Sequence, residues 1–211
     1  MAWGLGVGIL VIALLFLFFA FVIFKETRTH RFWREKVEEG DLEMIRQLVV
    51  AEVENWRTER PPKGTPASVW QGIQGVELVA IAPDAVRAST TAEPQFAMVS
   101  GARRQVSSAL DEAKRITARL AERFFYDIPH VRLERVQIDC YTTFQEAGRD
   151  PRQACILTTV AERADAAEID WDDEPPDVIA ERLGARYELD DRGAAVPLEP
   201  EDAVAQAEPA A

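Results

Sequence analysis

The sequence RVQIDCYTTF, from Arg135 to Phe144, alternates apolar and polar side chains. Successive side chains of a β-strand point to opposite faces, so Val136 and Ile138 share one face of the predicted strand. Gln137 and Asp139 share the other face. Such alternation is typical of an antiparallel sheet that has one face buried against the core.

The residues on either side of this strand add a partner strand and a helix. Ala154 to Val160 is predicted to return as the neighbouring strand. Upstream, Ser108 and Asp111 form a capping-box pattern, which predicts a long helix that ends near Tyr126. Shorter strands are predicted at 76–82, 85–90 and 95–99. We therefore predict an α+β domain with an antiparallel or mixed sheet packed against one long helix.

The negative charge of the chain is concentrated at its carboxy-terminal end. The net charge is −12, and the residues from Glu162 onward hold sixteen Asp or Glu and four Arg. The preceding part is therefore neutral overall, and a neutral body with an acidic end is expected to bind nucleic acid poorly. We predict a soluble domain over 67–192 followed by an acidic disordered tail over 193–211.

The amino-terminal region contains a long apolar run, GLGVGILVIALLFLFFAFVIF, from Gly4 to Phe24. A helix that rises about 1.5 Å per residue would span roughly 30 Å over this run, the thickness of a bilayer core. We predict a transmembrane anchor within residues 1–24, in contact with lipid through residues 4–24. The alternatives are a cleaved signal peptide and a helix buried in the protein.

The charges behind the apolar run predict its orientation. Five basic residues follow it within twelve positions: Lys25, Arg28, Arg31, Arg34 and Lys36. Positive charges close to a membrane span tend to stay in the cytoplasm. The sequence thus predicts a single-pass inner-membrane protein with its amino terminus outside and a cytoplasmic domain. Gly4 and Gly8 form a small-xxx-small pair that predicts packing against another membrane helix.

Residues 25–66 form the predicted connection between anchor and domain. A charged segment is followed by a helix that Asp41 caps and that ends near Glu59. A proline-rich linker over 60–66 comes next. Apolar residues recur along one face of the helix, and four of them are predicted to bind a partner: Leu42, Ile45, Val49 and Trp56. Packing of this stripe on the domain or on the next helix is the interpretation favoured over partner binding.

No catalytic, cofactor-binding or metal-binding motif stands out in the sequence. Cys140 and Cys155 are interpreted as small packing residues, with a redox or metal role as the alternative. The acidic loop that contains Trp171, Asp172 and Asp173 is predicted to be a further partner-binding surface.

These features favour a membrane-anchored accessory, scaffolding or assembly protein with a cytoplasmic interaction domain and no cofactor. Its predicted partners are other subunits of a membrane complex or a second copy of the chain, and not nucleic acid. One alternative is a membrane-tethered metal-dependent hydrolase or nuclease that uses sheet and loop carboxylates, among them Glu112, Glu134, Asp139 and Asp172. The other is a homo-oligomeric membrane sensor.

Overall fold

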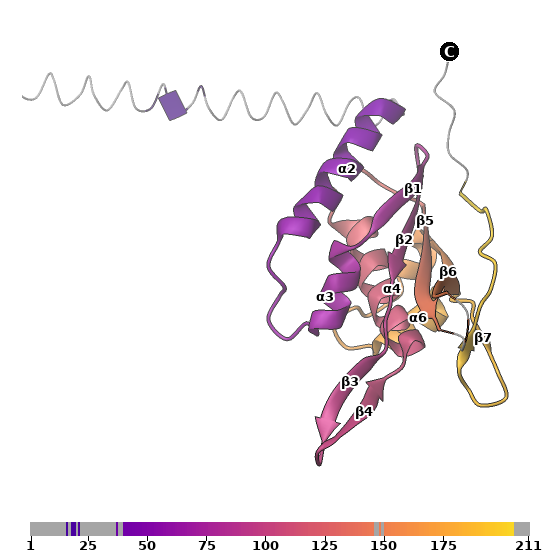
Figure 1. Cartoon of the computed structure of the whole chain (residues 1–211). Helices are drawn as coiled ribbons and strands as arrows, with labels where there is room; N and C mark the ends of the chain where they lie inside the picture. Colours follow the sequence, from indigo (N-terminus) through magenta and orange to yellow (C-terminus); the bar gives the residue numbers. More distant parts are fainter. Residues whose placement is uncertain are drawn as a thin grey trace, which may run out of the picture.

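The computed structural model describes residues 16, 18, 19, 21, 37, 40–145, 148 and 150–204. Its centre is a four-stranded mixed sheet in the order β1-β2-β5-β6 (Figure 1). The strands are β1 Glu77–Ile81, β2 Ala85–Thr91, β5 Arg135–Phe144 and β6 Arg152–Glu162. β2 and β5 pair in parallel, whereas β1 and β6 pair antiparallel with their neighbours. The predicted α+β class and mixed sheet are therefore confirmed.

The parallel pairing of β2 and β5 requires a crossover, and a helix provides it. α4, Ala109–Tyr126, runs across one face of the sheet and buries Ile116, Leu120 and Phe124. α3, Ala67–Gln74, packs beside α4, and α2, Leu42–Thr58, lies on the outer side of this layer (Figure 1). The core thus lies between these helices and one face of the sheet, and Ile179 and Leu183 from later in the chain complete it.

The start of α4 is fixed by the predicted capping box. The Ser108 hydroxyl accepts a hydrogen bond from the Asp111 backbone N–H at 3.0 Å, and the Asp111 carboxylate accepts one from the Ser108 N–H at 3.0 Å. Two backbone donors that have no partner within the helix are satisfied in this way. The hydrogen bond with Ser108 lowers the pKa of Asp111 below its usual value.

This pKa shift predicts how the cap responds to acid. A carboxyl group with a lowered folded-state pKa stabilises the protein above its unfolded-state pKa, and this stabilisation is lost as the pH falls through the folded-state value. Asp111→Asn is therefore expected to lower the melting temperature at pH 7, with a difference from wild type that shrinks as the pH approaches about 2. Thermal unfolding followed by circular dichroism measures both values. An undiminished difference at low pH would show that the charge is not the stabilising element.

The remaining elements are a hairpin and a carboxy-terminal wrap. β3 Gln95–Val99 and β4 Ala102–Ser107 form a two-stranded sheet of their own. After β6 come two short helices and a small hairpin: α5 Arg163–Ala166, α6 Pro176–Arg182, β7 Glu188–Leu189 and β8 Ala195–Val196. The chain then runs along the sheet on the side away from α4 (Figure 1). Residues 193–204, predicted as a disordered tail, are thus placed against the domain, whereas 205–211 lie outside the described residues.

The predicted membrane anchor is not supported. No helix in the described part of the chain is long and apolar enough to cross a membrane. The longest, α4, has 18 residues, of which seven are charged. A membrane span needs about 20 apolar residues in one continuous helix, and α4, the longest described helix, meets neither the length nor the apolar composition. This finding contradicts the predicted transmembrane helix over residues 4–24 and the lipid contact, single-pass topology and inner-membrane localisation inferred from it.

Parts of these predictions lie outside the described residues. Of the apolar run, the structure describes Phe16, Phe18, Phe19 and Phe21, which are helical and exposed. Gly4 and Gly8, for which helix packing was predicted, and the basic residues between 25 and 36 are outside the described ranges.

Candidate interaction surface

The β3–β4 hairpin forms an arm that projects from one end of the sheet (Figure 1). We call residues 95–107 the arm. Its strands pair from Val99 with Ala102 back to Gln95 with Ser107. The turn consists of Ser100 and Gly101, which have φ angles of 54° and 82°. Two positive φ angles match a two-residue type I′ turn, whose twist fits that of the strands. The arm is therefore a hairpin with a tight turn and one register irregularity at its base, between Gln95 and Phe96.

The arm exposes apolar side chains that the core does not cover. Phe96 is 46 % exposed, Met98 70 %, Val99 41 % and Val106 59 %. Phe96 and Met98 share one face of the hairpin, whereas Val99 lies on the other face. Single exposed apolar residues are normal, but four on one projecting hairpin are a concentration of apolar surface of the kind that marks a contact with another molecule. A two-stranded hairpin on its own is marginally stable in water, so a partner would also stabilise the arm.

The charge of the arm is entirely positive. Arg103 and Arg104 on β4 are its charged residues, and no Asp or Glu occurs between positions 94 and 107. The Arg103 guanidinium lies 4.3 Å from the centre of the Phe96 ring. A cation over an aromatic face is attracted to it, so this contact holds both side chains in place on the arm surface. The arm thus combines apolar area with two cations in a chain that is acidic overall.

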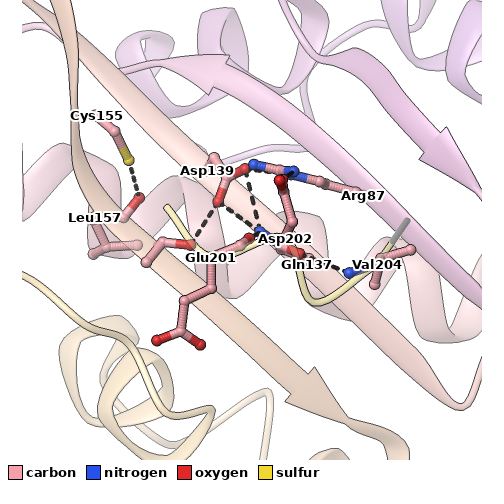
Figure 2. Close-up of polar contacts among 9 residues, drawn as sticks. Arg87, Gln137, Asp139, Cys155, Leu157, Glu201, Asp202 and Val204 are labelled. Carbon is pink, nitrogen blue, oxygen red and sulfur yellow. Dashed lines mark hydrogen bonds and ion pairs between the residues drawn. The ribbon is translucent and has the colours of Figure 1, made fainter. Parts of the chain in front are cut away.

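A second polar feature lies on the sheet face that α4 does not cover (Figure 2). The Asp139 carboxylate accepts hydrogen bonds from Arg87 Nε at 2.8 Å, Thr158 Oγ1 at 2.5 Å and Gln137 Nε2 at 3.2 Å. Asp139 is 1 % exposed. Burial alone would lower the pKa of Arg87, but the hydrogen bonds to Asp139 and Asp202 raise it. The buried negative charge of Asp139 is therefore balanced by the Arg87 guanidinium, and the side chains of Thr158 and Gln137 donate two further hydrogen bonds to it.

The carboxy-terminal segment 197–204 covers this cluster (Figure 2). Gln137 binds its backbone twice: Nε2 donates to the Glu201 carbonyl at 2.5 Å, and Oε1 accepts from the Val204 N–H at 3.2 Å. Arg87 is paired with Asp202, and Arg186 with Glu201. The acidic residues of this segment therefore neutralise arginines of the chain's own domain.

The structure separates the residues for which partner binding was predicted. Ile45, Val49 and Trp56 are buried in the core, and Leu42 is half-buried against it. The ring of Trp56 meets that of Phe124 on α4 edge to face at 5.0 Å. The side of α2 expected to bind a partner is thus occupied by the chain itself.

The predicted acidic loop lies elsewhere on the surface. The Trp171 indole N–H donates to the Ala166 carbonyl at 3.2 Å. The backbone N–H groups of Asp172 and Asp173 both donate to the Asp170 carboxylate at 3.3 Å. These contacts fix the turn and leave the carboxylates of Asp172 and Asp173 exposed.

The carboxylates named for a hydrolase do not assemble. Glu112 is paired with Arg115 on α4, and Glu134 with Arg132. Asp139 is engaged as described above. Within the described residues no group of three or more His, Cys, Asp or Glu side chains could hold a metal ion.

Both cysteines are buried and free. Cys140 lies under α4, where its sulfur is 3.3 Å from Thr117 Oγ1. Burial raises the pKa of Cys140 to about 12 and that of Cys155 to about 11. A thiol with such a pKa carries little thiolate at neutral pH, which fits the packing interpretation better than a redox role.

Comparison with known proteins gives no family, because no family model, no curated protein and no solved structure matches the chain.

Proposed function

We propose that this chain is an accessory or scaffolding protein that binds another protein through the arm. The observation that carries the proposal is the group of four exposed apolar side chains on a projecting hairpin with two arginines. Apolar contact area supplies affinity, whereas charges mainly set orientation and association rate. The partner surface is therefore expected to be an apolar patch with carboxylates at its rim.

Photo-crosslinking tests this proposal in the cells that express the chain. A photoreactive phenylalanine analogue placed at Met98 is expected to give adducts of one or a few defined masses. The matched control carries the same analogue at Val178 on α6, which is also exposed. The proposal is wrong if position 98 gives no adduct, or if both positions give the same set.

Charge reversal on the arm tests the chemistry assigned to the partner. Arg103→Glu with Arg104→Glu is expected to reduce the adduct yield at position 98 by about tenfold, because two like charges then face the acidic rim. Both arginines are exposed, so the melting temperature is expected to stay within about 2 °C of wild type. An adduct with twice the mass of the chain would identify a second copy as the occupant and overturn the proposal of a different protein.

A further inference from the structure

The segment 197–204, with the sequence PLEPEDAV, lies across the sheet face that α4 does not cover (Figure 2). We call it the strap. All of its residues are described, and none belongs to a helix or strand. Near its start, the Leu198 N–H donates to the Cys155 carbonyl of β6 at 2.9 Å. At its end, Val204 packs against one alanine of β1 and one of β2: Ala80 and Ala85. The strap therefore crosses the sheet from one edge to the other.

The sheet recognises two features of the strap, its main chain and its carboxylates. The side-chain amide of Gln137 bonds to the backbone of the strap at two positions, through both of its polar atoms. Arg87 on β2 is paired with Asp202, and Arg186 beside β6 is paired with Glu201. Bonds to the main chain do not depend on the side chains of the bound segment, whereas the two arginines require carboxylates at adjacent positions. Any extended peptide with such a pair of carboxylates can make the same contacts.

Few of the contacts that hold the strap are strong. The side chains of Glu201 and Asp202 are 65 % and 86 % exposed, and ion pairs with exposed partners contribute little to stability. Val204 is the only buried residue of the strap. Segments with few buried apolar contacts open at a lower free energy than the core does. The strap is therefore expected to leave the sheet while the rest of the domain stays folded.

The face beneath the strap is polar, so it tolerates water. Arg87, Gln137 and Asp139 lie there and bond to one another as well as to the strap (Figure 2). The main hydrophobic core lies on the other side of the sheet, and Val204 is not part of it. When the strap leaves, water can replace the hydrogen bonds that it made, and little apolar surface becomes exposed.

We infer that this face of the sheet is a binding site for an extended acidic peptide of a partner protein, and that the strap occupies the site in the free chain. The partner peptide displaces the strap, places two adjacent carboxylates against Arg186 and Arg87, and bonds to Gln137 through its main chain. The strap thus makes binding competitive and lowers the affinity for weak ligands. The site is separate from the arm and does not depend on the function proposed for it.

A fluorescein-labelled peptide with the sequence of residues 197–204 tests the inference on the full-length chain. The strap variant, Glu201→Lys with Asp202→Lys, turns like charges toward Arg186 and Arg87 and leaves the face itself unaltered. The peptide is expected to bind this variant at least about tenfold more tightly than wild type, because the attached strap of wild type competes at a high effective concentration. Fluorescence anisotropy measures both affinities.

A matched control separates strap release from a change in overall charge. The loop variant, Asp172→Lys with Asp173→Lys, changes the charge of the chain by the same amount at two exposed positions far along the sequence from the strap. It is expected to bind the peptide as weakly as wild type. The inference is wrong if the strap variant shows no saturable binding up to about 1 mM, or if both variants bind equally. It is also wrong if the strap variant loses cooperative thermal unfolding, because the strap would then be part of the fold.

Two further substitutions assign the binding to the carboxylates and to this face. A peptide with Glu201→Gln and Asp202→Asn is expected to bind the strap variant at least about tenfold more weakly than the original peptide, because both charged contacts are lost. In the same variant, Arg186→Gln is expected to weaken binding of the original peptide, whereas Arg192→Gln, at another exposed position, is expected to leave it unchanged. Equal binding of the two peptides, or equal effects of the two arginine variants, would refute the inference.

Hydrogen exchange of the unmodified full-length chain tests whether the strap opens on its own. The amides of Leu198 and Val204, which are bonded to the sheet, are expected to exchange at least about tenfold faster than those at the centre of β5. Equal rates would mean that the strap leaves only when the whole domain unfolds. A partner peptide would then have no folded chain to bind, and the inference would fail.

Discussion

Asp139→Ala is expected to lower the free energy of unfolding by about 3–5 kcal/mol, because it leaves the buried Arg87 guanidinium without its main partner. The Arg87 side chain is 11 % exposed, and its Nε is bonded to Asp139 at 2.8 Å. Gln137 and Thr158 lose an acceptor in the same variant. Chemical unfolding of the variant and the wild type, with the slopes compared, measures the difference.

Two further variants show whether the loss comes from an unpaired charge. The double variant Arg87→Met with Asp139→Leu replaces both ionic groups by apolar ones and is expected to regain most of the stability, as apolar replacements of buried ion pairs often do. Asp202→Ala removes the other carboxylate that is bound to Arg87. Because the Asp202 side chain is 86 % exposed, this variant is expected to lower the free energy of unfolding by at most about 1 kcal/mol. If the double variant is as unstable as Asp139→Ala, the loss of stability comes from packing and not from the unpaired charge of Arg87.

Elements with strong local patterns could be predicted from the sequence. The capping box at Ser108 and the apolar periodicity after it correspond to α4, Ala109–Tyr126. Asp41 caps α2 through the Met44 N–H at 3.2 Å, as its position before an apolar stripe indicated. The alternation after Arg135 corresponds to β5. The two caps join residues three positions apart, and the alternation of β5 lies within one ten-residue strand.

Features that depend on distant residues could not be predicted. The parallel pairing of β2 with β5 joins residues about fifty positions apart. The segment 193–204 has a composition typical of disorder, yet Gln137 and two arginines of the domain bind it. Local composition contains no information on these partners.

The surface proposed for a partner was also not apparent from the sequence. Gln95–Val99 was predicted as a strand, but β4, Ala102–Ser107, was not, because its two arginines interrupt the apolar pattern. Without the second strand, no pattern distinguishes Phe96 and Met98 from the other apolar residues of the chain. The absence of acidic residues between 94 and 107 is the pattern that could have drawn attention to this part of the chain.

The apolar stripe of α2 allowed two interpretations, packing on the domain and partner binding, and the structure places Ile45, Val49 and Trp56 in the core. Trp56 is 1 % exposed, lies against Phe124, and donates from Nε1 to Glu52 Oε1 at 2.9 Å. Trp56→Ala would remove a large buried ring and leave a cavity between α2 and α4. Such substitutions cost about 3–5 kcal/mol.

We therefore expect Trp56→Ala to lower the stability of the isolated full-length chain by about this amount, as measured by chemical unfolding. The control is Val50→Ala, on the same helix but 41 % exposed, with an expected change below about 0.5 kcal/mol. If α2 instead served as a docking surface that leaves the domain in the free chain, Trp56→Ala would change the unfolding free energy no more than Val50→Ala does. In that case Trp56→Ala would reduce only the amount of partner protein that is isolated together with the chain. The stability measurement alone separates the two roles, because a core residue acts without any partner present.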